Sequence, residues 1–180
     1  MGNTALIIRL QFILQMNFLN ANMENNILFQ PNPVTIKIPP PQKILIIYNP
    51  ISSAGNTEAI ANHLKIELNF HGKSVEVRAS EKKMKGYTRI ADDIAASDLV
   101  VVVGGDGTIR KLLDIINKTN TPIYAIPGGN ESLFARFYEM NANADDLLQA
   151  ITAGTCLQQF YGLISGKGIQ GEKPFFNMAS

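Results

Sequence analysis

The feature that most constrains the fold is a short run, Leu99-Val100-Val101-Val102-Val103, in which every side chain is apolar and four are β-branched. Such a run is typical of a strand that is buried on both faces, as in a parallel sheet between layers of helices. Further strand-like segments lie at residues 44–48, 74–78 and 123–126. The sequence therefore predicts a buried sheet built from these segments.

Segments with helical spacing of apolar residues separate the strands. We expect helices over residues 57–71, 87–96, 109–116, 132–138 and 145–153. Because a helix follows each predicted strand, the chain can return to the same end of the sheet before the next strand begins, which makes the strands parallel. The prediction is a doubly wound α/β domain, with a mainly parallel sheet and helices on both faces. Such domains bind ligands in the crevice beyond the carboxyl ends of the strands.

Composition divides the chain near Lys43. Residues 1–42 contain five of the nine prolines, one of the 14 glycines and only three of the 31 charged residues. Proline removes a backbone donor and disfavours helix at the preceding residue, so the Pro-rich part of this segment is expected to be an extended linker. We therefore predict a poorly ordered extension over residues 1–42, followed by an α/β lobe over residues 43–154.

An apolar stretch runs from Ala5 to Leu19 inside that extension. It is too short for a membrane span, and it contains Arg9 and three amide side chains. A signal peptide is also a poor match, because Arg9 lies inside the apolar core rather than before it. Two interpretations remain: an extension without a defined function, such as one from a start codon placed too far upstream, or a short amphipathic helix that touches a membrane.

Charge and cysteine content exclude several classes of protein. The 16 basic and 15 acidic residues give a net charge of +1, so no overall field would draw the chain to nucleic acid. The single cysteine, Cys156, excludes an intrachain disulfide framework and a cysteine-based zinc finger, and it favours a cytoplasmic protein. A basic cluster indicates either a solvated face or a contact to ATP or anionic lipid: Lys82, Lys83, Lys85 and Arg89. We assign no metal ligand.

The loop Gly104-Gly105-Asp106-Gly107-Thr108 directly follows the Val-rich strand and directly precedes a predicted helix. Its glycines allow the backbone to approach a ligand closely, and the helix N-terminus that follows offers unpaired N–H groups to an anion such as phosphate. Asp106 would repel phosphate unless a metal, a substrate hydroxyl or a hydrogen bond compensates for its charge. The alternative is a tight turn in which Asp106 is the N-cap of the helix.

Two further loops occupy equivalent places. Asn49 to Gly55 follows the first strand of the lobe, and Pro127 to Ser132 follows the fourth. Each is polar and contains glycine, and each alone also fits an ordinary turn, with Thr57 or Ser132 as the cap of the next helix. Because the strands are expected to be parallel, all three loops should lie at one edge of the sheet.

Taken together, the three loops resemble those of the diacylglycerol kinase and sphingosine kinase type lipid kinases, which are relatives of NAD kinase. The resemblance covers about Lys43 to Ser180. In that family the first strand ends in Asn-Pro with Ser and Gly after it, and the third ends in Gly-Gly-Asp-Gly-Thr. The fourth ends in Pro-x-Gly-Thr-x-Asn followed by Phe-Ala-Arg, where this chain has Pro127 to Arg136.

The resemblance implies an enzyme that uses ATP and Mg²⁺ to phosphorylate a lipid alcohol, such as diacylglycerol or a sphingoid base, at a membrane surface, with no nucleic-acid partner. It places Asp106 at the active centre as the catalytic residue, acting through metal or substrate. It also implies that residues of the loops hold the nucleotide: Asn49, Pro50, Ser52, Ser53, Ser80, Gly104, Gly105, Asp106, Gly107, Thr108, Gly129, Asn130 and Glu131.

The chain departs from the family pattern at several of these places. Asn130 stands where the family usually has Thr, and Ser132 stands where it usually has Asn. Lys111 lies where many members carry Glu, and Ser53 fills a position that is often Gly. Ser80 corresponds to a nucleotide-contacting Thr of the family when one residue is inserted into the alignment.

Length is the largest departure. In the family, a second and mostly β-sandwich lobe follows the nucleotide lobe and provides the lipid cleft, further metal-binding residues and the proposed base. Residues 155–164 and 175–180 resemble the opening strands of that lobe. We therefore expect residues 155–180 to begin a β-rich lobe whose remainder is absent from this chain.

Three functions remain open. The first is the ATP-binding lobe of a diacylglycerol-kinase-like lipid kinase, and the second is a truncated, inactive fragment that binds nucleotide. The third is an enzyme related to NAD kinase or phosphofructokinase, which also use a Gly-Gly-Asp-Gly loop. The Asn49-Pro50 turn and the Phe134-Ala135-Arg136 sequence favour the lipid kinases over the third.

Overall fold

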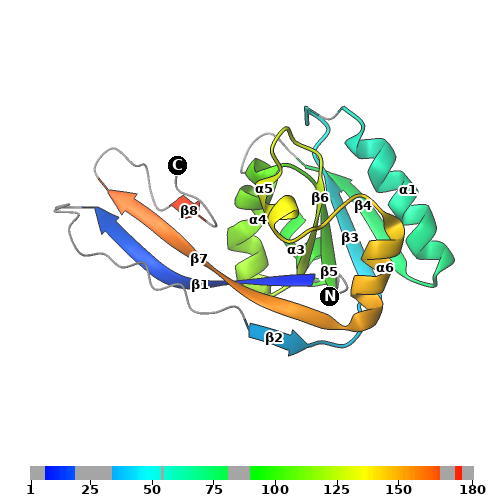
Figure 1. Ribbon diagram of the computed structural model, residues 1–180, viewed down its shortest axis with the longest axis horizontal. Coiled ribbons are helices and arrows are strands. Elements are labelled where there is room, and N and C mark those ends of the chain that lie inside the picture. The colour runs from blue at the N-terminus through cyan, green and yellow to red at the C-terminus, as the bar shows by residue number, and fades with distance from the viewer. Residues whose placement is uncertain (1–6, 19–33, 54, 81–89, 167–172, 176–180) are drawn as a thin grey trace.

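The computed structural model describes residues 7–18, 34–53, 55–80, 90–166 and 173–175 (Figure 1). The strands are β1 (Ile7–Phe18), β2 (Val34–Lys37), β3 (Lys43–Tyr48), β4 (Ser74–Ala79), β5 (Leu99–Gly104), β6 (Ile123–Pro127), β7 (Thr155–Gly166) and β8 (Lys173–Phe175). The helices are α1 (Thr57–Phe70), α3 (Ala91–Ala95), α4 (Asp106–Thr119), α5 (Leu133–Phe137) and α6 (Ala144–Ala153).

The centre of the sheet is parallel, as predicted. β3 pairs in parallel with β4 on one side and with β5 on the other, and β5 pairs in parallel with β6. The spatial order β6-β5-β3-β4 means that the chain moves outward from β3 to β4 and then crosses back to β5. The strand order therefore reverses between β3 and β5, and their carboxyl ends flank the topological switch point of the sheet.

Helices cover both faces of these strands (Figure 1). α1 and α6 contact each other on one face, and α3 and α4 contact each other on the opposite face. All six residues of β5 are buried, as are the four apolar residues at the middle of β3, which explains why these strands read as continuous apolar runs. The doubly wound α/β fold predicted from the sequence is confirmed.

The N-terminal segment differs from the expectation. An amphipathic helix between Ala5 and Leu19 is wrong, because Ile7–Phe18 forms strand β1. β1 pairs in parallel with β7 over most of its length and meets β6 in an antiparallel pair at Ile8 and Ile123. Residues 34–37, inside the predicted linker, form β2 and pair with β7 on its other side. Parts of the first 42 residues therefore belong to the sheet.

The C-terminal segment contains the first of the two strands that the sequence suggested, β7, and a second short strand, β8, that begins earlier than expected. β7 pairs with the antiparallel β8, and both belong to the same sheet as the parallel strands. Figure 1 shows β1 and β7 running side by side beyond the helical layers. The assignment of residues 155–180 to a second lobe stays a prediction, and residues 176–180 lie outside the described part of the chain.

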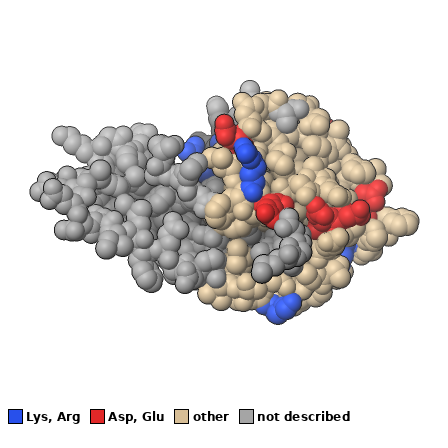
Figure 2. Space-filling model, viewed as in Figure 1, with Lys and Arg blue, Asp and Glu red and all other residues tan. Residues whose placement is uncertain are grey.

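The described residues show neither a membrane-spanning helix nor a large charged patch on the face drawn in Figure 2. No helix among them is both long enough and apolar enough to cross a membrane. On the face drawn in Figure 2, their charged side chains form small separate groups of either sign, and most of that described surface is uncharged. The basic cluster predicted over residues 82–89 lies outside the described residues.

Candidate functional site

The three predicted loops meet at one edge of the sheet. The first loop leaves the carboxyl end of β3 at Asn49, residues 104–108 span the junction between β5 and α4, and residues 128–132 join β6 to α5. Asn49 N–H donates to Val103 O over 3.0 Å, so the first loop starts beside the end of β5. The loops therefore lie at the switch point, where doubly wound folds bind their ligands.

Backbone contacts join the glycine loops directly. Gly128 N–H donates to Gly104 O over 3.0 Å. A Cβ on Gly128 would lie 3.1 Å from two backbone atoms of Gly104, and a Cβ on Gly129 would lie 3.0 Å from Gly105 Cα. These distances are shorter than an ordinary contact between carbon atoms. The third loop therefore needs glycine at 128 and 129 for its close approach to the second.

A side-chain hydrogen bond joins the first loop to the third. The Ser52 hydroxyl donates to Gly128 O. The turn that presents Ser52 is stabilised by Asn49, whose main-chain oxygen accepts from Ser52 N at 3.1 Å and whose Oδ1 accepts from Ile51 N at 3.3 Å. This is the turn chemistry for which Asn is favoured. The predicted residues Asn49, Ser52 and Gly104 are thus in one network.

The Asp106 side chain connects the second loop to the third. The sequence allowed Asp106 to be the N-cap of its own helix, and the structure shows a different role. Gly105, not Asp106, is the N-cap of α4, and Asp106 is the first residue of that helix. Its carboxylate accepts from Leu133 N and from Phe134 N, each over 2.9 Å. Asp106 therefore caps the N-terminus of α5, where negative charge is favourable.

Ser132 does not cap α5 with its side chain. Its φ is 47°, in the left-handed region that few residues other than Gly and Asn adopt readily. Its hydroxyl instead accepts from Gly129 N over 3.1 Å, within the same loop. Ser132 is the N-cap residue of α5, as expected, but its side chain binds none of the helix amides, because Asp106 occupies those that a cap would use.

The first turn of α4 offers the feature that phosphate binding requires. The first N–H groups of a helix have no partner within it and lie at the positive end of its dipole. Here Thr108 N–H already donates to Gly105 O over 2.9 Å, whereas Asp106 and Gly107 stand at the start of the helix. Gly107 is exposed, and a Cβ there would have no neighbouring atom within 4 Å. This end of α4 is therefore open to a ligand.

The remaining predicted residues differ in exposure. Ser53, Asn130 and Glu131 are exposed at the loops, whereas Thr108 is buried beneath them. Ser80 is buried directly after β4, and its N–H donates to Tyr48 O over 2.7 Å. Ser80 thus lies at the carboxyl end of β4, the neighbour of β3, on the same edge of the sheet as the three loops. The sequence missed Gly128 and Thr57, which contact each other, although both lie within or beside loops that it singled out.

Acidic groups at the site are few. Among the described residues, no group of three or more His, Cys, Asp and Glu side chains could hold a metal ion. Mg²⁺ is commonly bound by one or two carboxylates together with substrate phosphates, so such a cluster is not required. Each carboxylate oxygen of Asp106 accepts one N–H and keeps further lone-pair capacity. Asp106 therefore fits as the one carboxylate ligand of a Mg²⁺ ion whose other ligands include phosphate oxygens.

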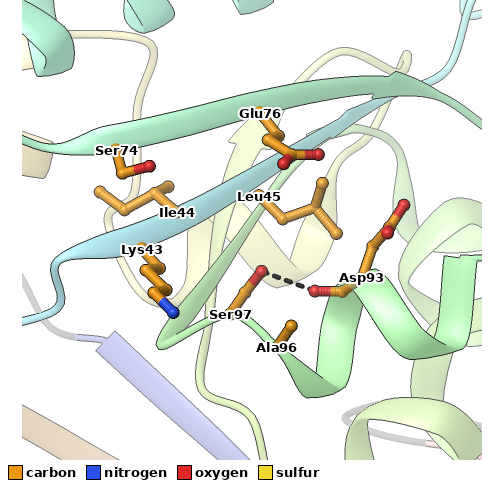
Figure 3. A pocket seen from close by; sticks show the side chains of 8 residues that line it. All are labelled: Lys43, Ile44, Leu45, Ser74, Glu76, Asp93, Ala96 and Ser97. Carbon is orange, nitrogen blue, oxygen red and sulfur yellow. Dashed lines mark hydrogen bonds between the residues drawn. The ribbon is translucent and has the colours of Figure 1, made fainter.

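A separate pocket of about 220 Å³ lies at the opposite end of the strands. Figure 3 shows its lining, which comes from the start of β3, the start of β4 and the end of α3: Lys43, Ile44, Leu45, Ser74, Glu76, Asp93, Ala96 and Ser97. The Ser97 hydroxyl donates to Asp93 O over 2.7 Å. Because this pocket lies beyond the amino ends of the strands, it is distinct from the loop site.

A family of known proteins matches the part of the chain that contains the loop site. The model of the "Diacylglycerol kinase catalytic domain" matches residues 43–161, which include the parallel strands and all three loops. The chain belongs to the diacylglycerol kinase catalytic domain family. The match begins at β3, so β1 and β2 lie outside the part of the chain that the family model covers.

Two named relatives and one solved structure are similar to parts of this chain. A "Putative lipid kinase" of Streptococcus pneumoniae is 27% identical over 139 residues, which are 71% of this chain and 47% of the relative. A similarly named protein of Staphylococcus haemolyticus is 30% identical over 86 residues, 47% of this chain and 26% of the relative. A crystal structure of a diacylglycerol kinase from Bacillus anthracis has a TM-score of 0.50 at 20% identity, covering 63% of this chain and 40% of that one. The chain thus spans about half the length, or less, of these relatives.

Proposed function

We propose that residues 43–154 are the ATP-binding lobe of a lipid kinase. In the complete protein, this lobe would present the γ-phosphate of ATP to the hydroxyl of a lipid alcohol, such as diacylglycerol or a sphingoid base. Residues 155–180 would begin the further lobe that completes the lipid cleft. Because the substrate lies in a membrane, the enzyme would act from the cytoplasm at the membrane surface.

One observation carries this proposal: three loops from the ends of β3, β5 and β6 are hydrogen-bonded into one site at the open N-terminus of α4. Glycine at 128 and 129 lets the third loop lie against the backbone of the second, beside the N-terminus of α4. Phosphoryl transfer depends mainly on positioning and on neutralising phosphate charge, and this site offers both.

The nucleotide would lie along the edge of the sheet. The amides of Gly105 to Gly107 would bind phosphate oxygens, and Thr108 would hold this turn through its N–H, which donates to Gly105 O. The polar groups of the other loops would contact the rest of the nucleotide. Those groups are Asn49, Pro50, Ser52, Ser53, Ser80, Gly129, Asn130 and Glu131. Asp106 would act at the active centre by holding Mg²⁺ against the phosphates. The ion would neutralise phosphate charge during transfer.

Calorimetric titration of the chain with ATP in the presence of Mg²⁺ tests the proposal. The wild type should bind, and Asp106→Ala should bind more weakly, because it removes the carboxylate from the loop site. Asp114→Ala is the matched control, since Asp114 is an exposed aspartate of the same helix away from its N-terminus. The control should bind as the wild type does. Absence of ATP binding by the wild type would contradict the proposal.

A further inference from the structure

Thr57 is a buried polar residue at the centre of the loop site. It is the first residue of α1, and its exposed fraction is 3%. The sequence suggested that Thr57 caps this helix, but the N-cap is Asn56, and the Thr57 hydroxyl points elsewhere: it donates to Asn49 O over 2.7 Å. This hydroxyl therefore bonds to the first loop rather than to its own helix.

The other branch of the same side chain contacts the third loop. Thr57 Cγ2 would lie 2.8 Å from a Cβ on Gly128, so the methyl group fills the space that a larger residue at 128 would need. One buried side chain thus touches the loop after β3 with its hydroxyl and the loop after β6 with its methyl group.

The Asn49 oxygen that Thr57 binds begins a continuous path through the site. That oxygen also accepts from Ser52 N, the Ser52 hydroxyl donates to Gly128 O, and Gly128 N donates to Gly104 O. Each step is a hydrogen bond between two of the loops or within one of them. Movement of the Asn49 oxygen would therefore displace Ser52 and, through Ser52, the two glycine loops.

We propose that the Thr57 hydroxyl is a positioning group for the site: by holding Asn49 O, it fixes the Asn49–Ser52 turn against the glycine loops and so increases nucleotide affinity. Thr57 has no direct contact with the nucleotide in this account. The predicted effect of the Thr57 hydroxyl on nucleotide affinity rests on the proposed function. Its predicted effect on the position of the loops does not.

Two substitutions separate the hydroxyl from the methyl group. Thr57→Val keeps the shape of the side chain and removes the hydrogen bond, whereas Thr57→Ser keeps the hydroxyl and removes the methyl group. We expect Thr57→Val to lower the affinity for ATP with Mg²⁺ by about fivefold, the equivalent of one ordinary hydrogen bond. Thr57→Ser should stay within about twofold of the wild type, which is the rescue expected when the hydroxyl acts by positioning.

Thr121→Val is the matched control. Thr121 is also a buried threonine, with an exposed fraction of 4%. Its hydroxyl is also hydrogen-bonded to a main-chain oxygen, Ile94 O, over 3.2 Å, and it lies 2.8 Å from Thr119 Oγ1. Thr121 lies before β6, at the end of the sheet opposite the loops. Thr121→Val should lower thermal stability about as Thr57→Val does and leave ATP affinity unchanged. Equal loss of affinity in both Val variants, or in Thr57→Val and Thr57→Ser, would overturn the proposal.

Hydrogen exchange distinguishes failure of this inference from failure of the proposed function. The amides of Ser52 and Gly128 both donate within the path described above. Thr57→Val should accelerate their exchange in the absence of nucleotide, and Thr121→Val should not. If the wild type binds no ATP, the proposed function fails while accelerated exchange still supports positioning by Thr57. Unchanged exchange at both amides would overturn the positioning role itself.

Discussion

Replacing Gly107 by alanine should make the protein more stable and make it bind ATP more weakly. Gly107 is exposed in the first turn of α4, where a Cβ would meet no atom within 4 Å, and its φ is outside the left-handed range. Nothing in the described part of the fold therefore requires glycine at this place. A ligand that approaches the backbone closely would require it.

The stabilising effect follows from helix propensity. Alanine is favoured over glycine inside a helix by about 0.5–1 kcal/mol, and a first-turn residue should be near the lower end of that range. For a chain of this size, such a change corresponds to a rise of about 1–3 °C in the midpoint of thermal unfolding. Thermal denaturation followed by circular dichroism would measure it.

The loss of binding follows from the position of the Gly107 amide. A phosphate oxygen bound to this N–H would lie about 2.9 Å from the nitrogen, close to the methyl group that alanine adds. Loss of one charge-assisted hydrogen bond costs about 1.5–3 kcal/mol, which is roughly a 10- to 100-fold decrease in affinity. Calorimetric titration with ATP and Mg²⁺ would measure it. A Gly107→Ala variant that is more stable and binds ATP as tightly as the wild type would refute the reasoning.

Other predictions concern buried residues of the fold. Gly128→Ala should lower the free energy of unfolding by about 1–3 kcal/mol through overpacking, because the new Cβ would lie 2.8 Å from Thr57 Cγ2; an unchanged urea midpoint would contradict the loop contact. Burial raises the pKa of Tyr124 from 10.0 to about 12. The neutral phenol is thus favoured in the folded protein, so stability is retained below pH 10 and is lost as the pH rises toward about 12. Tyr124→Phe should lose less stability than the wild type between about pH 9 and pH 11 in urea denaturation, and equal losses would contradict this assignment.

The parallel core could be predicted because its signals are local and strong. Leu99 to Val103 is apolar at every residue since β5 is buried on both faces, and helical spacing marks the segments between the strands. The meeting of the loops also followed from the sequence, because parallel strands end at a common edge. The contacts that join the loops did not follow from it.

Those contacts were missed because they are made between residues distant in the chain. The first amides of α5 are bound by the side chain of Asp106, at the start of α4, and not by the side chain of the N-cap residue Ser132. Thr57 was expected to be a local cap, but its hydroxyl donates to Asn49 O, in the loop after β3. Local capping patterns identify a residue that can accept or donate, and the tertiary fold decides which partner it meets.

The N-terminal strand shows a different limit. The stretch from Ala5 to Leu19 is apolar without a clear period, and short apolar runs do not distinguish a strand from a helix. β1 is a strand because it finds partners in β7 and β6, which follow it by more than 100 residues. The local pattern of apolar residues cannot indicate a pairing between strands so distant in the chain.

Amide chemical-shift mapping with ATP and Mg²⁺ tests the central claim most directly, because it reports which backbone groups meet the nucleotide. We predict that the largest shifts fall on the amides of Gly105, Asp106, Gly107 and Gly129, at the open end of α4 and the loop beside it. Shifts confined to the pocket at Lys43 and Glu76, or no shifts at saturating nucleotide, would contradict the assignment of the loop site.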